Sequence, residues 1–315
     1  MVHAFIFPGQ GSQSVGMGKE LAEAFPSARA VFEEVNDVLN QKLSDIMWSG
    51  PEDDLKLTSN TQPALMACSV AAMTALKAEF DIDVTSAKYV AGHSLGEYSA
   101  LCAAGALSLA DTARLLRLRG DAMQKAVPVG AGAMCALLGA SVEDAEAAAS
   151  AGQKLGICQI ANDNATGQIV LSGEAAAVEA AAKFASDAGV KKAVILPVSA
   201  PFHCDMMAPA ADAMRDALMD TTLLAPRVAV VNNVTAKPTV NAEQIMQDLV
   251  SQVTGRVRWR ESIEWMASEG EIVTFAEPGC GKVLTQMLKR IVKGVSGSAL
   301  NSPESLEAFA NSLKK

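Results

Sequence analysis

The 315-residue sequence lacks the paired cysteines and histidines that are typical of a metal site or a disulfide framework. It has three histidines and six scattered cysteines, and no C-x-x-C pair occurs. We therefore expect no metal site, and we interpret the cysteines as small core residues of a reduced, cytoplasmic protein. These cysteines are Cys68, Cys102, Cys135, Cys158, Cys204 and Cys280.

Basic charge and long apolar runs are also scarce. The net charge of −9 argues against nonspecific binding to nucleic acids or to anionic membranes. The longest apolar stretch, 64–76, is broken by Ser69 and Thr74 and is shorter than the roughly 20 residues of a membrane span. The N-terminus lacks the basic and apolar regions of a secretory signal peptide. We expect a cytoplasmic protein that binds neither nucleic acid nor membrane.

Short β-like runs alternate with amphipathic helical patterns, which predicts an α/β fold with a mainly parallel sheet. Half of the residues are hydrophobic, enough for a large core. A long helix is expected to begin near Pro63, and another at Ser108 with a capping-box-like start. The predicted strands of this part are 4–7, 88–91, 227–231, 272–276 and, more weakly, 294–300.

The middle of the chain follows a different order. Strand, helix, strand, strand, helix, strand is the ferredoxin-like arrangement, so we predict a ferredoxin-like subdomain at 129–197. The large α/β domain is then discontinuous, 1–128 and 198–315. The predicted strands of the insert are 133–138, 156–161, 168–172 and 191–196, its helices are 141–151 and 174–188, and 162–167 is turn-rich.

The sequence Gly92-His93-Ser94-Leu95-Gly96 follows a predicted strand and precedes a helical run. A strand, a G-x-S-x-G turn and a helix form the context of a nucleophile elbow, in which glycines allow a turn tight enough to expose the serine. The free N–H groups at the helix start, first of all that of Leu95, could stabilise an oxyanion. The alternative is that Ser94 only caps the helix.

A catalytic serine needs a base, and His203 is the remaining candidate. His3 opens the first predicted strand, and His93 is adjacent to Ser94 in a tight turn, where neighbouring side chains point apart. His203 lies on a proline-bounded loop before a predicted helix. A lone histidine is more often structural, but elimination favours His203 if imidazole activates Ser94. The third member of a triad cannot be chosen from the residues.

Arg119 lies on the apolar face of the helix predicted after Ser108. Helical spacing groups it with Leu115, Leu116 and Met123. A buried guanidinium is costly without partners, so Arg119 should meet a carboxylate or several carbonyls. Two interpretations remain open: a structural salt bridge, for example to Glu97, or a fork of donors for a substrate carboxylate.

Two glycine-rich stretches do not qualify as nucleotide-binding loops. The sequence Gly9-Gln10-Gly11 has Ser14 where the dinucleotide fingerprint requires glycine. The sequence around Gly279-Cys280-Gly281-Lys282 lacks the first glycine and the Ser/Thr of a phosphate loop. Both are interpreted as tight turns.

Taken together, these motifs resemble the family of malonyl-CoA:acyl carrier protein transacylases of bacterial fatty-acid synthesis, over essentially the whole chain. The resemblance implies a hydrolase-like large domain with the inserted ferredoxin-like subdomain. The matching residues are Phe7-Pro8-Gly9-Gln10-Gly11-Ser12-Gln13, Gln62-Pro63-Ala64, Gly92-His93-Ser94-Leu95-Gly96-Glu97-Tyr98, Arg119-Gly120, Ser172-Gly173, Phe202-His203-Cys204 and Asn232, Val234 and Thr235.

The resemblance also implies the roles of the site residues. Ser94 would be acylated by malonyl-CoA, His203 would act as base and then acid, and Arg119 would bind the malonyl carboxylate. Oxyanion donors would be the backbone N–H groups of Gln10 and Leu95, and the carbonyl of Gln252 would orient His203. The implied partners are malonyl-CoA and acyl carrier protein, with no metal or redox cofactor, and we expect a monomer.

Three alternatives remain at this level. A serine hydrolase would place its acid between Ser94 and His203, and the interval contains Asp163, Glu174 and Asp187. A noncatalytic carrier-binding domain is disfavoured because Ser94, His203 and Arg119 are all present. A different acyl group, such as methylmalonyl, depends on pocket shape.

Overall fold

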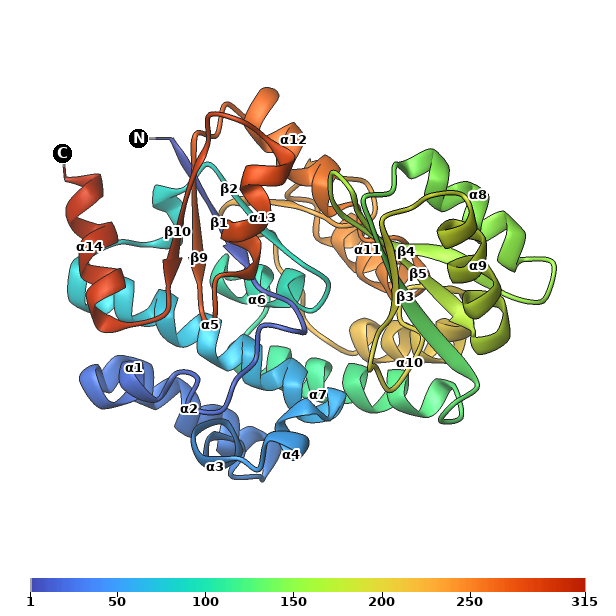
Figure 1. Ribbon diagram of the computed structural model, residues 1–315. Coiled ribbons are helices and arrows are strands. Elements are labelled where there is room, and N and C mark those ends of the chain that lie inside the picture. The colour runs from blue at the N-terminus through green and yellow to red at the C-terminus, as the bar shows by residue number, and fades with distance from the viewer. Residues whose placement is uncertain (1, 315) are drawn as a thin grey trace.

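The computed structural model describes residues 2–314 and contains two β-sheets (Figure 1). The larger sheet has six strands in the order β10-β9-β1-β2-β7-β8. All neighbours are parallel except β7 and β8. The α/β prediction with a mainly parallel sheet is therefore confirmed. These strands are β1 (His3–Phe7), β2 (Tyr89–Gly92), β7 (Ala229–Val231), β8 (Pro238–Thr239), β9 (Thr274–Pro278) and β10 (Ser296–Leu300).

The central strands are apolar on both faces, because helices cover both sides of the sheet. In β1, Phe5 and Phe7 belong to one apolar cluster, and Ala4 and Ile6 belong to another. The first face is covered mainly by α5 (Thr58–Phe80), α6 (Gly96–Ala103), α7 (Leu109–Ala126) and α14 (Pro303–Leu313). The second is covered by α12 (Trp259–Ser268) and α13 (Val283–Ile291).

The remaining helices pack around this core. They are α1 (Lys19–Ala24), α2 (Pro26–Leu39), α3 (Leu43–Ser49), α4 (Glu52–Lys56), α10 (Ala208–Met219) and α11 (Ala242–Thr254), with short 3-10 turns at Val84–Ser86 and Asp205–Met207. No helix within residues 2–314 is long and apolar enough to cross a membrane.

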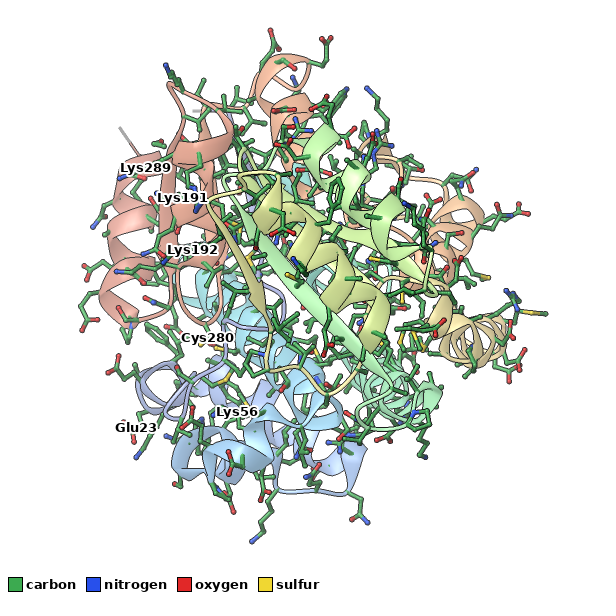
Figure 2. The ribbon with its side chains drawn as sticks, turned by 45° about the vertical axis from the view of Figure 1, so that its right-hand side comes forward. Glu23, Lys56, Lys191, Lys192, Cys280 and Lys289 are labelled. Carbon is green, nitrogen blue, oxygen red and sulfur yellow. The ribbon has the colours of Figure 1, made fainter. Side chains whose placement is uncertain are left out.

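The smaller sheet has four antiparallel strands in the order β4-β5-β3-β6. One face packs against two alanine-rich helices through its own apolar cluster, and these helices come forward in green and yellow in Figure 2. Met134 and Val170 on the other face join the main core cluster. The elements are β3 (Gly132–Leu138), α8 (Val142–Gly152), β4 (Cys158–Ala165), β5 (Gln168–Glu174), α9 (Ala175–Asp187) and β6 (Lys192–Ile195).

Two local predictions were wrong. The helix expected to start near Pro63 starts at Thr58, because Thr61 and Asn60 bond the carbonyls of Leu55 and Asp54 and anchor an earlier first turn. The turn-rich segment expected at 162–167 is mostly strand, since β4 continues to Ala165 through two register irregularities. Polar side chains occur in this strand because Asn162 and Asn164 face a pocket.

Candidate active site

Ser94 lies in the tight turn between β2 and α6, with a positive φ of 53°. Two glycines make this turn possible. A Cβ on Gly92 would lie 1.9 Å from the backbone carbon of Gly96, and a Cβ on Gly96 would lie 2.3 Å from the carbonyl oxygen of Phe7. The elbow is therefore held against β1 at a spacing that only glycine permits. The left-handed backbone of Ser94 is the kind of strain that concentrates at functional sites.

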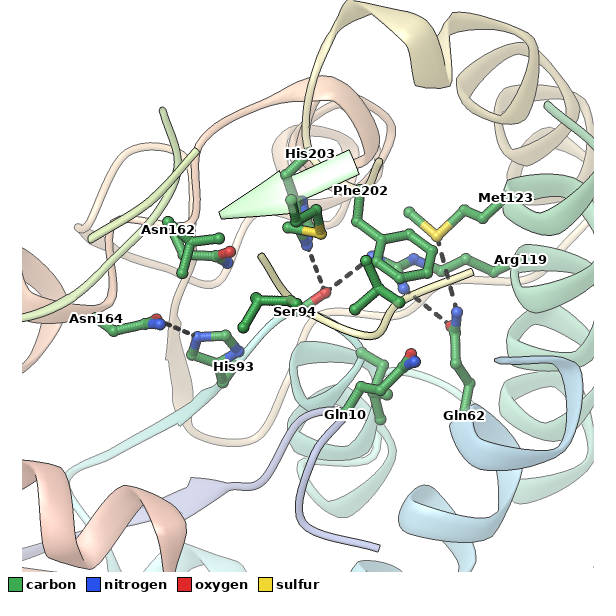
Figure 3. Close-up of a pocket in the computed structure, with 15 residues that line it drawn as sticks. Gln10, Gln62, His93, Ser94, Arg119, Met123, Asn162, Asn164, Phe202 and His203 are labelled. Carbon is green, nitrogen blue, oxygen red and sulfur yellow. Dashed lines mark hydrogen bonds between the residues drawn. The ribbon is translucent and has the colours of Figure 1, made fainter. Parts of the chain in front are cut away.

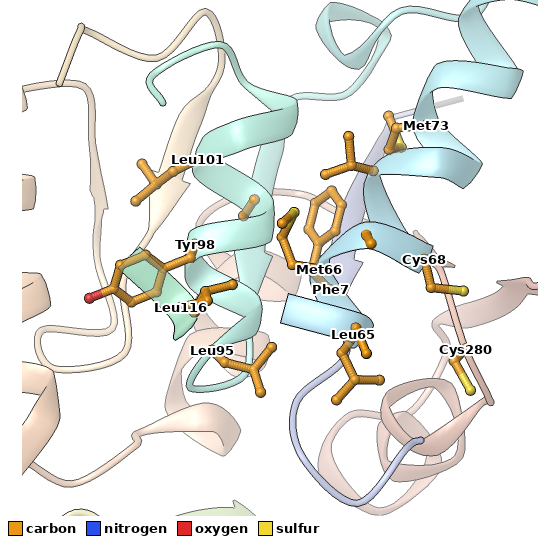
Figure 4. Close-up of a cluster of buried hydrophobic side chains, with 14 of the residues drawn as sticks. Phe7, Leu65, Met66, Cys68, Met73, Leu95, Tyr98, Leu101, Leu116 and Cys280 are labelled. Atoms are coloured by element: carbon orange, nitrogen blue, oxygen red, sulfur yellow. The ribbon is translucent and has the colours of Figure 1, made fainter. Parts of the chain in front are cut away.

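The elbow rests on the main core cluster (Figure 4). Leu95 at the N-cap of α6 and Tyr98 on that helix are fully buried there, as are Phe7 of β1 and Leu116 of α7. A rigid base of this kind fixes the direction in which Ser94 projects.

Ser94 and His203 meet across the pocket although 109 residues separate them in the chain. Ser94 Oγ lies 2.8 Å from Nε2 of His203, and Nδ1 of His203 lies 2.8 Å from the main-chain oxygen of Gln252. The carbonyl can only accept, so Nδ1 carries the proton and Nε2 is free to accept from the serine hydroxyl. Burial, assisted by the charge of Arg119, lowers the pKa of His203 to about 3. The imidazole is thus neutral near pH 7 and able to take a proton.

Within residues 2–314, no carboxylate takes the place of the Gln252 carbonyl. The three acids that a hydrolase could have used are engaged elsewhere: Asp163 with Arg260, Glu174 with the N–H of Ile157, and Asp187 with Lys183. The arrangement is a Ser–His pair oriented by a neutral group.

Arg119 is 1% exposed and reaches the nucleophile. Its Nη2 donates to Ser94 Oγ at 3.2 Å and to Oε1 of Gln252 at 2.8 Å, and its Nη1 donates to Oε1 of Gln62 at 2.9 Å. Its guanidinium carbon lies 5.7 Å from the ring centroid of Tyr98. The sequence predicts a carboxylate or several carbonyls as partners of Arg119. The hydrogen bonds of its guanidinium go to neutral side-chain oxygens. Nε has no partner within the described residues, so the fork of donors is not saturated.

The pocket around Ser94 has a volume of about 180 Å³ (Figure 3). Polar groups gather at Ser94, whereas Met134 and Val170 of the four-stranded sheet form part of an apolar wall. Concave sites with a few convergent polar groups are typical of small-molecule binding. The lining residues are Gln10, Gln62, His93, Ser94, Leu95, Arg119, Met123, Met134, Asn162, Asn164, Val170, Leu196, Val198, Phe202 and His203.

Gln10 and Leu95 both border this pocket. Within residues 2–314, neither backbone N–H donates a hydrogen bond to another group of the chain. The loop of Gln10 packs tightly on the elbow, because a Cβ on the neighbouring Gly9 would lie 2.5 Å from the carbonyl oxygen of His93. Two free donors beside the serine could serve a developing oxyanion.

Asn233 and the side chain of Gln252 contact the elbow, and neither contact was part of the sequence-based prediction, which gave Gln252 a role only through its carbonyl. The side chain of Asn233 accepts from the N–H of Ser94 at 2.7 Å and donates to the carbonyl of Gly92 at 2.7 Å. The amide nitrogen of Gln252 donates to the carbonyl of Ser94 at 3.1 Å and to Glu97 at 2.8 Å. Burial raises the pKa of Glu97 to about 7. The only sequence signal for Asn233 was its position between Asn232 and Val234, which the resemblance had already marked.

His93 points away from Ser94, as its place in a tight turn predicted. Its Nε2 lies 2.7 Å from Oδ1 of Asn164, and its ring meets Trp259 edge-on. Burial lowers the pKa of His93. Among the described residues, no group of three or more His, Cys, Asp or Glu side chains is arranged to hold a metal ion.

Comparison with known proteins gives a consistent result. The sequence model of the acyl transferase domain matches residues 4–305. The malonyl CoA-acyl carrier protein transacylase of Bacillus subtilis strain 168 is 42% identical over 316 residues, which cover 99% of this chain and 97% of the relative. The protein of the same name from Escherichia coli K12 is 43% identical over 308 residues, 97% of each chain.

Comparison with solved structures leads to the same family. The acyl-carrier-protein-S-malonyltransferase of Bartonella henselae is 54% identical, with a TM-score of 0.97 and 100% of both chains covered. A malonyl-transacylase solved in complex with a type II PKS acyl-carrier protein is 41% identical, with a TM-score of 0.95, and the match covers 99% of this chain and 100% of the other.

Proposed function

The chain belongs to the acyl transferase family, and we propose that it transfers a malonyl group from malonyl-CoA to the phosphopantetheine thiol of acyl carrier protein in fatty-acid biosynthesis. A single observation carries the proposal: the buried guanidinium of Arg119 lies 3.2 Å from the hydroxyl of Ser94, which is bonded to His203. A fixed cation beside the nucleophile suits an acyl group that carries its own carboxylate.

The first half of the reaction forms an ester on Ser94. His203 Nε2 takes the hydroxyl proton while Oγ attacks the thioester carbonyl carbon. The backbone N–H groups of Gln10 and Leu95 stabilise the oxyanion. The C–S bond then breaks, and His203 returns the proton to the departing CoA sulfur.

The second half reverses these steps with a new thiol. His203 takes the proton of the phosphopantetheine thiol, the thiolate attacks the malonyl ester, and the Ser94 oxygen leaves with the proton. The carbonyl of Gln252 holds Nδ1–H throughout and stabilises the transient imidazolium. A ping-pong order follows, because both acyl partners use the same serine.

Arg119 selects the acyl group in this mechanism. Gln62 and Gln252 hold the guanidinium in place with their side-chain oxygens, and its remaining donor capacity receives the malonyl carboxylate. An uncharged acyl chain would leave the buried cation without that partner, which disfavours acetyl groups.

Exposed basic residues near the four-stranded sheet are the candidate surface for the acidic carrier protein. Lys192 pairs with Leu138, Leu138 pairs with Gln168, and the side chain of Gln168 accepts from Arg290 at 3.0 Å. These contacts bring the basic residues around β6 close to those at the end of α13. Figure 2 labels three of the lysines. The set is Lys191, Lys192, Lys289, Arg290 and Lys293.

The domain organisation is part of the same proposal. Residues 129–197 form a ferredoxin-like subdomain inserted into a hydrolase-like large domain of 1–128 and 198–315. The order β3-α8-β4-β5-α9-β6 and the sheet order β4-β5-β3-β6 support this division. We also propose that the protein is a monomer, because one chain supplies every residue of the site. The scattered, unpaired cysteines favour a cytoplasmic location.

The test is acylation of the purified protein. We would mix the protein with malonyl-CoA, stop the reaction within seconds, and locate the adduct by intact mass and peptide mapping. A malonyl adduct on Ser94 that is absent in Ser94→Ala, and that acyl carrier protein removes without release of malonate, supports the proposal. An adduct that decays to malonate without a thiol acceptor would indicate a hydrolase instead.

A further inference from the structure

An ion pair ties strand β4 to helix α12 behind the wall of the pocket. The side chain of Asp163 in β4 is 1% exposed and that of Arg260 in α12 is 22% exposed. Nε of Arg260 donates to Oδ1 and Oδ2 of Asp163 at 3.0 and 3.1 Å, and Nη2 donates to Oδ2 at 2.8 Å. A forked contact of this kind fixes orientation as well as distance.

Backbone hydrogen bonds reinforce the same connection. The N–H of Asp163 donates to the carbonyl of Val257 at 2.9 Å, and the N–H of Val257 donates to the carbonyl of Ala161 at 2.8 Å. Val257 belongs to the short segment that joins α11 to α12. That segment follows directly from the last turn of α11, where Gln252 offers its carbonyl to His203.

The neighbours of Asp163 face the opposite way, because successive side chains of a strand alternate between its faces. Asn162 and Asn164 both line the Ser94 pocket, whereas neither Asp163 nor Arg260 does. Asn164 holds the ring of His93 at 2.7 Å, and that ring also meets Trp259, the first residue of α12. Helix α12 is therefore linked to β4 directly at Asp163 and, through the ring of His93, at Asn164.

A buried ion pair by itself is weak evidence for stability, since loss of hydration offsets much of the attraction. Its effect here is geometric. We infer that Asp163 and Arg260 are positioning residues, which hold β4 so that Asn162 and Asn164 stand opposite Ser94 and the acyl-CoA binds productively. The inference rests on the proposed acyl transfer at Ser94.

The test compares three variants with the parent: Asp163→Asn, Arg260→Gln and the double variant. For each, the rate of malonyl-Ser94 formation is measured against malonyl-CoA concentration. Each single change should raise the half-saturating concentration about tenfold and alter the saturated rate much less, since a wall displaced by a fraction of an ångström weakens productive binding. In the double variant two amides can bond each other, so its loss should be smaller than the product of the single losses.

Glu261→Gln is the matched control. Glu261 is also on α12 and pairs with Arg256 and Arg258, and within residues 2–314 its side chain forms no hydrogen bond or ion pair with β4. Its removal should leave the half-saturating concentration unchanged. If Asp163→Asn does not fold, Arg260→Lys changes the more exposed partner and keeps one charged contact, and a smaller rise of the same kind is expected.

NMR of the imidazole groups supplies a second readout, because the chain has only three histidines. Release of β4 should loosen Asn164 from His93 and shift the His93 signals in the Asp163 and Arg260 variants but not in Glu261→Gln. Variants with a lower melting temperature, unchanged half-saturation and unchanged His93 signals would overturn the inference. A parent chain that malonyl-CoA does not acylate would instead overturn the proposed function.

Discussion

The main-chain oxygen of Gln252 lies 2.8 Å from Nδ1 of His203, at the position where a hydrolase triad carries a carboxylate. The side chain of the same glutamine accepts from Arg119 and donates to the carbonyl of Ser94 and to Glu97. One residue thus orients the base with its backbone and the cation with its side chain. Its carbonyl survives any substitution at the position, so the two contributions can be separated by mutation.

Arg119→Ala should lower kcat/KM for malonyl-CoA by about 100-fold or more, because a charge-assisted contact with the substrate is lost and Gln62 and Gln252 lose their donor. The relative rate with acetyl-CoA should rise. Acylation rates with both thioesters measure this. Arg114→Ala is the control, since Arg114 lies on the same helix but on its exposed face, paired with Asp111. If the ratio of the malonyl-CoA rate to the acetyl-CoA rate is the same in the parent and in Arg119→Ala, Arg119 does not select the acyl group.

His203 should set an unusual pH profile. Its pKa, lowered to about 3 by burial and by Arg119, keeps the base neutral far below the usual 6.5. The value of kcat/KM for malonyl-CoA should therefore not fall between pH 7 and 5 through protonation of this residue. His203→Ala should reduce acylation about 10²- to 10⁴-fold. A kcat/KM that declines in the parent with a midpoint near pH 6.5 would contradict the buried, neutral imidazole.

The same shift should affect stability. Between about pH 3 and 6.5 the unfolded state binds the proton that folded His203 refuses, so the free energy of unfolding rises with pH across this window. The contribution is fully present above the unfolded pKa and is lost as the pH falls toward 3. Chemical denaturation at several pH values, with His203→Gln for comparison, measures it. The variant should lose less stability on acidification than the parent.

The pKa shift of Glu97 should make the free energy of unfolding fall, not rise, as the pH increases. Burial raises its pKa from 4.5 to about 7, so its stabilising protonated form is present below pH 4.5 and is lost as the pH rises through 7. Glu97→Gln mimics the protonated acid and can still accept from Gln252 and from the N–H of Asn233. The free energy of unfolding of this variant, relative to the parent, should increase between pH 5 and pH 8. A constant difference would show that Glu97 does not titrate in this range.

Asn233→Ala should weaken both the fold and the elbow. The substitution leaves the N–H of Ser94 and the carbonyl of Gly92 without partners in a strained turn, at a cost of roughly 1–3 kcal/mol each. Thermal unfolding should report the loss, and acylation of Ser94 should slow even where the protein remains folded. Asn301→Ala, an exposed asparagine with a single long bond of 3.3 Å to Gly281, is the control and should behave like the parent.

Much of the site could be reached from residue patterns. The strand, G-x-S-x-G turn and helix identified Ser94 because the elbow is a local structure, encoded within a few consecutive residues. Arg119 stood out because helical periodicity assigns each residue to a face. His203 followed from elimination, which was possible only because the chain has three histidines.

Other parts of the site had no local signal. Asn233 reaches Ser94 across 139 residues and Gln252 reaches it across 158, and no periodicity encodes such a meeting. The strand character of 162–165 was hidden because Asn162, Asp163 and Asn164 break the hydrophobic alternation by which strands are recognised. The two asparagines line the pocket, and Asp163 pairs with Arg260.

The sequence by itself determined the α/β alternation, the elbow that exposes Ser94 and the unusual placement of Arg119, because backbone sterics and helical periodicity act over a few residues. Only the tertiary structure decided what surrounds them: the Asn233 side chain at the elbow, amide oxygens in place of a carboxylate at Arg119, and the Asp163–Arg260 pair behind the pocket. These contacts join segments far apart in the chain, and packing of the two sheets and their helices brings them together.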